Sequence, residues 1–501
     1  MKGRTFPPLV AFALGAALSF YVLAGFLPAE GDKIMSGEVW IALLAAAVAG
    51  AGVTFAETPS SSLLCGRTSR GCRAGARLLF ALGSGFIFGL VAIERLPPPP
   101  SFGFPDRSVT AISGLLAEDP RRLENGTSLL VVKLLTASDA VGRRASASGR
   151  FAAFSGDADL GAIRAAGKGS LIAIEGTVAQ GRAGPVLRAR SAEVLRSPGE
   201  PERRRNALFS AALSRFSRVK WGGLAAALLL GNREGLDDGE GERYAKSGCA
   251  HVLSLSGMHL AVISALVALV LKKPLGLRAA AVVGTLLVSC YVFFVGFQPA
   301  LTRSVIMYGF GAAALLGGYP RRVQPLLAAA FIVQLVADAE SARSTSFVLS
   351  YLALFGIALL GSAADDLSGS LLPRFLRAPI ATSIGAFLAT AAVCAATFGS
   401  LRPIGIIAGL LVAPAVTCLM IGALVWFILD LLVPTIAAAV APLVGFAAEV
   451  SDRTVGEASR FRGIDTPTYI PTLMASLAVS VLLVYGRYRL EEMRNRVDPF
   501  D

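Results

Sequence analysis

The chain alternates between long apolar runs and one stretch in which polar and apolar residues take turns. Three apolar runs open it, at residues 6–28, 36–56 and 78–95, and the others follow residue 250. Each run approaches the roughly 20 residues that a helix needs to cross a bilayer. The pattern therefore predicts a polytopic α-helical membrane protein of about twelve spans.

The later apolar runs are less uniform than the first three. Two of them are short, and a third contains Pro414, a residue that can break a helix. The runs lie near residues 252–271, 276–297, 301–318, 323–338, 346–363, 379–398, 403–430, 434–450 and 468–487.

Residues 101–200 have a different pattern. Short segments such as 128–134 and 170–178 alternate apolar and polar side chains, and Gly, Asp and Asn separate them. A period of two bounded by turn residues predicts strands. About five strands in so short a segment suit a small β-barrel, and an OB-like fold is the natural candidate. Four prolines at 97–100 form a stiff spacer before it.

Residues 201–221 are predicted to form an amphipathic helix. Arginine and lysine side chains occupy one face, and the other face is apolar. Such a helix lies on lipid headgroups or contacts a polyanion, and the pattern favours neither. The apolar face consists of Leu208, Phe209, Ala212, Leu213, Phe216 and Val219.

The charge pattern predicts the topology. The formal net charge is +13, and Lys or Arg pairs follow alternate apolar runs. Basic residues accumulate in cytoplasmic loops, so we expect a bacterial inner (plasma) membrane protein with cytoplasmic termini and an outer β-domain. The first run is read as an uncleaved span. The expected domains are a membrane segment at 1–100, the β-domain at 101–200, the amphipathic helix at 201–221, a membrane domain at 222–490 and a tail at 491–501.

One short polar segment interrupts the apolar region. The chain has two histidines, His251 and His259, and Ser254, Ser256 and Gly257 lie between them. In hydrocarbon such groups are costly unless they face protein or water, which makes this segment the best candidate for a functional site. Small residues and histidines also serve helix packing, so a purely structural role stays open.

Metal and nucleotide chemistry find no support in the sequence. The histidines are eight positions apart, or about 80° apart on an ideal helix, without cysteine or carboxylate neighbours. The six cysteines are scattered and suggest no disulfide framework. No phosphate-binding nucleotide loop is found. We therefore expect no cofactor, no metal and no enzymatic activity.

Four segments together resemble the ComEC-type competence proteins. Residues 227–236 read Ala-Leu-Leu-Leu-Gly-Asn-Arg-Glu-Gly-Leu, and residues 251–259 read His-Val-Leu-Ser-Leu-Ser-Gly-Met-His. Residues 296–303 (Gly-Phe-Gln-Pro-Ala-Leu-Thr-Arg) and 347–353 (Phe-Val-Leu-Ser-Tyr-Leu-Ala) are similar to two further family segments. The chain departs from the family pattern at Asn232, Val348 and Gly409, where an acidic residue, Gln and Asn are usual.

The resemblance implies a channel that takes up single-stranded DNA during natural transformation. Other competence proteins would deliver the DNA and supply the motor. Many members carry a metallo-β-lactamase-like domain, but this sequence has no His-x-His-x-Asp-His cluster, so we expect another protein to degrade the second strand. The channel-lining candidates are His251, Ser254, Ser256, Gly257, His259, Arg303 and Ser350.

The outer domain is a second candidate for DNA contact, because OB-folds hold single strands with stacked aromatic rings and positive charge. The domain could instead be a structural cap over the passage. The candidate residues are Arg143, Arg144, Arg150, Phe151, Phe154, Arg188 and Arg190.

Three other readings of the sequence stay open. The chain could transport a smaller anionic solute or a lipid, it could be a scaffold in an envelope complex, or it could be a divergent family member without a role in competence. The last reading rests on Asn232 and on the missing nuclease motif.

Overall fold

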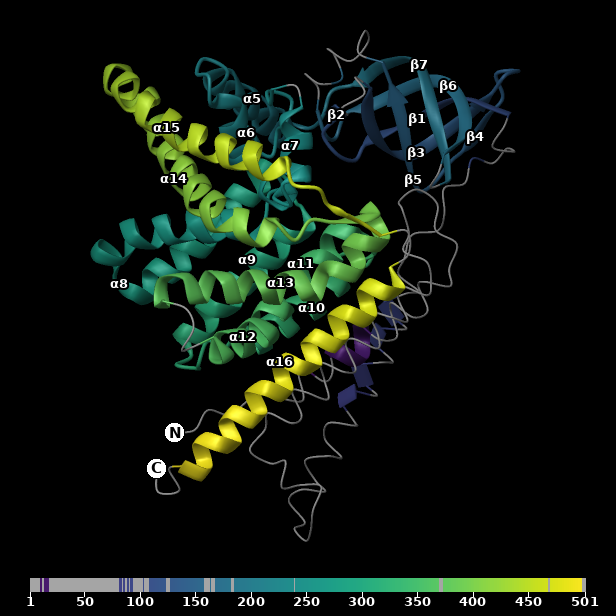
Figure 1. Ribbon diagram of the computed structural model, residues 1–501. Coiled ribbons are helices and arrows are strands. Elements are labelled where there is room, and N and C mark those ends of the chain that lie inside the picture. Colours follow the sequence, from purple (N-terminus) through teal and green to yellow (C-terminus); the bar gives the residue numbers. More distant parts are fainter. Residues whose placement is uncertain are drawn as a thin grey trace. The chain divides into compact units, whose positions relative to one another are not determined.

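Figure 1 shows the computed structural model of the chain. It describes residues 108–497, apart from short gaps at 123–126, 157–162, 164–166, 182–183, 238, 369–372 and 467–468, and scattered positions before residue 108. The spans expected at 6–28, 36–56 and 78–95 and the proline run at 97–100 fall wholly or largely outside the described residues. Two compact units meet in sequence between Val219 and Lys220.

The first unit contains a closed five-stranded barrel. Its main strands pair in the order β1–β3–β5–β7–β6 and back to β1, with β5 and β7 parallel and the other pairs antiparallel. This strand order and the closure confirm the expected small OB-like barrel. The strands are β1 (Val109–Leu116), β2 (Arg121–Arg122), β3 (Ser128–Asp139), β4 (Arg144–Ser146), β5 (Arg150–Ser155), β6 (Leu171–Gly181) and β7 (Gly184–Arg196).

Alternation and two glycines explain why these segments close into a barrel. On β3, Leu130, Val132 and Leu134 are at most 2% exposed, whereas Lys133 between them faces outward. Gly114 and Gly176 each lie at a register shift, where a Cβ atom would collide with the neighbouring strand. Such bulges bend strands sharply, which a small barrel requires.

Helix α5 (Glu200–Phe216) belongs to the barrel unit. Arg205 on α5 is only 9% exposed and donates a 2.7 Å hydrogen bond to Asp119, whose other carboxylate oxygen accepts from the backbone N–H of Lys168. Within the segment 201–221 the helix therefore ends at Phe216, before the expected end, and it docks on barrel loops through a buried arginine. Leu208 on α5 is 63% exposed. Lipid contact by that face stays a prediction.

The second unit is a bundle of apolar helices. In its described part, seven helices are long and apolar enough to cross a membrane, which confirms a polytopic helical membrane protein. The helices are α6 (Gly222–Leu230), α7 (Glu240–Lys246), α8 (Gly257–Val295), α9 (Pro299–Leu316), α10 (Val323–Ala337), α11 (Thr345–Gly356), α12 (Ser362–Leu367), α13 (Arg374–Phe398), α14 (Gly405–Leu432), α15 (Pro434–Ser459) and α16 (Ile470–Val497).

Helix α8 is two helices joined by a sharp turn. Gly276 has φ +74°, a left-handed conformation that favours glycine, and Pro274 precedes it. The two halves pack against each other, because a Cβ on Gly284 would lie 3.6 Å from Val267 Cγ1. The runs expected at 252–271 and 276–297 correspond to these two halves.

The other runs also form helices, with two differences from expectation. Helix α14 continues through Pro414 without a break, and α15 extends to Ser459 rather than ending near residue 450. Helices α14 and α15 lie side by side (Figure 1), with Val444 packed on Gly422. Helix α10 has 15 residues, shorter than a full span.

Two short strands pair beside these helices. Strand β8 (Ser400–Leu401) follows α13, and β9 (Ile464–Asp465) precedes α16.

Candidate functional site

The candidate site begins at a helix that is too short to span a membrane. Helix α6 has nine residues, and all but Gly223 are buried. It ends at Gly231, whose φ of +73° turns the chain back. Between α6 and α8 lie only α7 and a single turn of 3₁₀ helix, η4 (Ala250–Val252). A broken helical segment inside a bundle leaves backbone groups that need partners from side chains.

Two side chains supply those partners. Tyr291 on the second half of α8 donates from its hydroxyl to the carbonyl oxygen of Leu229, over 2.7 Å. Arg233 donates from Nε to the carbonyl oxygen of Leu253, over 3.1 Å. The sequence segments 227–236 and 251–259 are thereby tied together.

Ser256 and His259 form a capping box at the start of α8. The Ser256 hydroxyl oxygen accepts from Met258 N–H (3.3 Å), and His259 Nδ1 accepts from Ser256 N–H (3.1 Å). This reciprocal arrangement satisfies backbone donors at the helix start. Because Nδ1 is an acceptor, a neutral imidazole carries its proton on Nε2. That Nε2 atom is buried, without a hydrogen-bond partner among the described residues.

His251 and Ser254 are placed differently from this pair. Both are exposed, and the Ser254 hydroxyl donates to the His251 carbonyl oxygen over 2.8 Å. His259, in contrast, has no exposed surface. The polar segment therefore has an accessible half, His251 and Ser254, and an internal half, Ser256 and His259. Among the described residues, no group of three or more His, Cys, Asp or Glu side chains is placed to hold a metal ion.

Arg303 on α9 packs against the first residue of α8. A Cβ atom on Gly257 would lie 2.7 Å from the Arg303 Nη2 atom and 2.8 Å from Ser304 Oγ. A larger residue at this position would force the guanidinium or the Ser304 hydroxyl to move. Gly257 thus permits the close approach of a neighbouring side chain.

The same guanidinium reaches helix α11. Arg303 Nη1 donates to the carbonyl oxygen of Ser350, and the guanidinium carbon lies 5.7 Å from the centre of the Tyr351 ring. Arg303 is 7% exposed, and no carboxylate pairs with it within the described residues. A cation held by a carbonyl and an aromatic face is stabilised without being neutralised.

Gln334 on α10 completes this contact chain and was not predicted from the sequence. Its amide nitrogen donates to the carbonyl oxygen of Pro299 (3.1 Å), and its amide oxygen accepts from the Tyr351 hydroxyl (3.0 Å). The signal was a glutamine in the middle of an apolar run. Gly257, Arg303 and Ser350 are therefore joined by contacts across α8, α9 and α11, and Ser256 and His259 cap the start of α8 beside them. His251 and Ser254 lie just before α8 and bond to each other.

A second polar cluster joins α7 to α15. The buried Tyr244 hydroxyl shares a 2.9 Å hydrogen bond with Ser451, and Arg243 forms a 2.9 Å ion pair with Asp452. Burial raises the pKa of the Tyr244 phenol above its usual value, so the hydroxyl stays protonated. This cluster anchors the segment that leads into His251, and no motif in the sequence had predicted it.

The barrel candidates divide between surface and core. The five arginines among them are exposed, and Phe154 is half-buried. Phe151 is 3% exposed and packs edge-to-face on Phe102 within the barrel core. Its ring is not available to stack on a base, and the expectation for Phe151 is corrected accordingly.

Comparisons with known proteins agree with the motifs. The family model described as "Competence protein" matches residues 228–493, more than half of the chain. The ComE operon protein 3 of Bacillus subtilis (strain 168) is 26% identical over 150 residues, which is 30% of this chain and 19% of that protein. No solved structure matches. All four motif segments that meet around α8 lie within or overlap the matched region, and the chain belongs to the competence protein family.

Proposed function

We propose that the chain is a membrane channel for uptake of single-stranded DNA during natural transformation. The observation that carries the proposal is the meeting of the four motif segments at one broken-helix site. That site exposes His251 and Ser254 inside an otherwise apolar domain. A phosphodiester strand needs a hydrated route lined by donors, because its charge cannot cross hydrocarbon.

Within this site the residues take two roles. His251 and Ser254 are the groups that contact DNA, since they are exposed. Ser256, Gly257, His259, Arg303 and Ser350 hold the turn in shape, because the first and third cap the start of α8 and the others link α8 to α9 and α11. This division refines the seven channel-lining candidates.

The basic residues support a topology for the proposal. Lys272 and Lys273 lie at the turn within α8, Arg321 and Arg322 lie between α9 and α10, and Arg374 and Arg377 lie at the start of α13. These positions follow alternate passes, as the positive-inside rule requires of cytoplasmic ends. The start of α8 and the barrel then face outward.

The barrel surface offers a second place for DNA to bind. Phe154 on β5 pairs in register with Arg188 on β7, so an aromatic ring and a cation share one outward face. Stacking plus backbone charge is how OB-folds bind single strands. The motor, the delivery proteins and a nuclease for the second strand would be separate partners.

The test replaces the exposed half of the site. In a transformable bacterium that lacks its own competence membrane protein, the chain is supplied as wild type or as the double variant His251→Ala/Ser254→Ala. The matched control is Ser264→Ala, because the half-buried Ser264 also donates to a carbonyl three residues earlier through an exposed hydrogen bond.

At equal membrane abundance we expect the double variant to lower transformation at least about tenfold while surface binding of DNA is unchanged, because donors to several phosphates are lost. Ser264→Ala should transform as wild type. Equal transformation by the double variant would refute the role of this site. Reconstituted vesicles that admit small organic anions but exclude oligonucleotides would favour the small-anion transporter instead.

A further inference from the structure

A π-helical turn interrupts the helix that carries Ser350. Helices α11 and α12 form one continuous apolar segment, Thr345–Leu367, and residues Ile357–Gly361 within it adopt π-helical geometry (η6). Such turns are rare and occur mostly as single turns inside α-helices, where they are frequently associated with function. They persist only where surrounding contacts hold them.

Glycine packing against α13 is the first such contact. A Cβ on Gly385 of α13 would lie 2.6 Å from both the Gly356 oxygen and the Gly361 nitrogen. Both are backbone atoms, the oxygen of residue i and the nitrogen of residue i+5, which are the two groups that a π-turn pairs with each other. Gly385 therefore lies against the hydrogen-bonding groups of the π-turn itself, where a side chain would collide with them.

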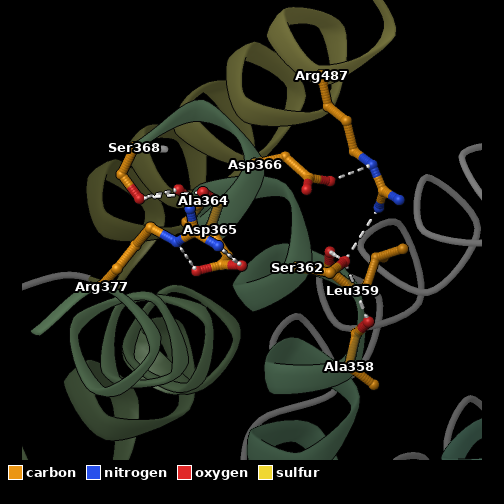
Figure 2. A network of polar contacts seen from close by, with 9 residues as sticks. All are labelled: Ala358, Leu359, Ser362, Ala364, Asp365, Asp366, Ser368, Arg377 and Arg487. Carbon is orange, nitrogen blue, oxygen red and sulfur yellow. Dashed lines mark hydrogen bonds and ion pairs between the residues drawn. The ribbon is translucent and has the colours of Figure 1, made fainter. Parts of the chain in front are cut away.

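Arg487 on α16 is the second contact, as Figure 2 shows. Its Nη1 atom donates to Ser362 Oγ over 3.0 Å, and Ser362 in turn donates to the Leu359 carbonyl oxygen within the π-turn over 2.8 Å. Its Nε atom lies 3.0 Å from an Asp366 carboxylate oxygen. One guanidinium thus supports both the π-turn and the helix that follows it.

Arg377 on α13 holds the next position. It forms a bidentate pair with Asp365 at 2.7 and 3.1 Å (Figure 2). Adjacent aspartates on α12 are therefore bound by arginines from two different helices. Bidentate arginine–carboxylate pairs fix orientation as well as distance. The rotation of α12 about its axis is set by these two pairs.

We propose that residues Ile357–Gly361 switch between a π-turn and an α-helical turn. Arg487 is the latch, the side chain whose contacts hold the π-turn. Converting Ile357–Gly361 to α-helix, with α11 fixed, rotates every later residue of the segment by about 100°. Ser362, Asp365 and Asp366 then leave their partners together. If α12 stays fixed instead, α11 rotates, and Ser350 moves away from Arg303.

The switch consequently connects two distant contacts through one helix. The Arg487 cluster biases the register at one end of the segment, and the Arg303–Ser350 hydrogen bond biases it at the other. Coupling of this kind requires an element with two discrete arrangements that both ends influence. The π-turn is such an element.

Hydrogen exchange of the full chain in lipid nanodiscs tests the latch without any DNA, so its outcome is independent of the function proposed above. The variants are Arg487→Gln, Ser362→Ala and the charge reversal Arg487→Asp/Asp366→Arg. The matched control is Arg453→Gln, because Arg453 pairs with Glu449 on its own helix and forms no ion pair with another helix in the part of the chain that the structure describes.

We expect Arg487→Gln to raise exchange of the amides in residues 357–363 about tenfold or more, the effect of losing a hydrogen bond to a charged group. Amide exchange in peptides covering residues 345–352 should rise as well. Ser362→Ala should raise exchange at 357–363. The charge reversal restores the ion pair between positions 366 and 487 but not the donor to Ser362, so it should bring the Arg487→Gln values only part of the way back to wild type. Arg453→Gln should leave both segments unchanged.

A rise confined to α16 in Arg487→Gln would overturn the proposal, because Arg487 would then be only a local anchor. A rise at 357–363 that never reaches 345–352 would overturn the coupling to Ser350. If Arg487→Gln fails to accumulate, Ser362→Ala decides the matter. It removes the hydroxyl relay and leaves the Arg487–Asp366 pair in place, and unchanged exchange at 357–363 in that variant refutes the latch.

Discussion

The guanidinium of Arg303 on α9 donates to the backbone carbonyl oxygen of Ser350 on α11, 47 residues later in the chain. The same side chain covers Gly257 at the start of α8. Three membrane helices therefore meet at one buried cation. Its contacts indicate that Arg303 holds the helices of the site together and does not bind the transported molecule.

Replacing Arg303 should consequently affect stability before it affects transport. Arg303→Gln removes the donor to Ser350 and leaves polar groups unpaired in the bundle, which costs about 1–3 kcal/mol. The thermal midpoint of the purified protein in detergent should fall, and membrane abundance with it. Arg453→Gln, which removes an exposed ion pair within α15, should cost at most about 1 kcal/mol. A stable but inactive Arg303→Gln protein would instead indicate direct contact with DNA.

The space at Gly257 gives a sharper steric test. Gly257→Ala places a methyl group within 3 Å of Arg303 and Ser304, and overpacking of this kind costs about 1–3 kcal/mol. The comparison is Gly311→Ala on α9, where the new methyl group would meet open space among the described residues beyond its own helix turn. We expect a lower thermal midpoint for Gly257→Ala and an equal or slightly higher one for Gly311→Ala.

The result at Gly257 is contradicted if both alanine variants melt alike. A double-mutant cycle with Arg303→Ala separates the causes. Removing the guanidinium should relieve most of the Gly257→Ala penalty, because the collision partner is gone.

The sequence was sufficient to predict most of the membrane helices, for a physical reason. A helix in hydrocarbon must be apolar over its whole length, so each span is visible without knowledge of its neighbours. Helix α6 escaped prediction because nine buried residues make a run shorter than a span. Pro414 does not mark the end of a helix, since α14 passes through it unbroken.

The pattern of apolar and polar residues did not predict which side chains contact one another in the tertiary structure. The polar segment was found because histidines are rare in this chain, yet the capping role of Ser256 and His259 depends on side-chain geometry. The Gln334–Tyr351 hydrogen bond depends on which helices are neighbours. On β5, Phe151 and Phe154 are three apart and so point to opposite faces, but alternation does not say which face is inside.

The turn at residues 139–143 of the barrel should become less stable in acid and when Asp139 is replaced. Burial alone would raise the pKa of Asp139, but hydrogen bonds from the Arg143 side chain and from the backbone N–H groups of Arg143 and Val141 outweigh it and hold that pKa below its ordinary value. Because the folded pKa is depressed, the stabilisation is complete above the ordinary value of about 3.9. It is lost as pH falls through the folded pKa.

Proteolysis reports this turn directly. Asp139→Ala should speed tryptic cleavage after Arg143 and Arg144 at neutral pH, because the loop loses its three hydrogen-bonded anchors. Glu193→Ala, which removes an exposed carboxylate on β7, should not. In the wild type, peptic cleavage of this loop should rise only in strong acid. A loop cut as readily at pH 5 as at pH 2 would contradict the assignment.

The two phenylalanines of β5 should behave in opposite ways. Phe154→Ala or Arg188→Gln should weaken binding of a fluorescent oligothymidine to the chain in nanodiscs, and loss of one stacked base corresponds to about five- to hundredfold in affinity. Phe151→Ala should instead unfold the barrel, because truncating a buried ring costs about 3–5 kcal/mol.

Anisotropy titrations at several salt concentrations measure the weaker binding, and proteolytic sensitivity of residues 108–196 measures the unfolding. Arg188→Gln should also flatten the salt dependence, since one phosphate contact is lost. If Phe154→Ala and Arg188→Gln bind as wild type does, the barrel is a cap over the passage and the DNA contacts lie with His251 and Ser254 alone.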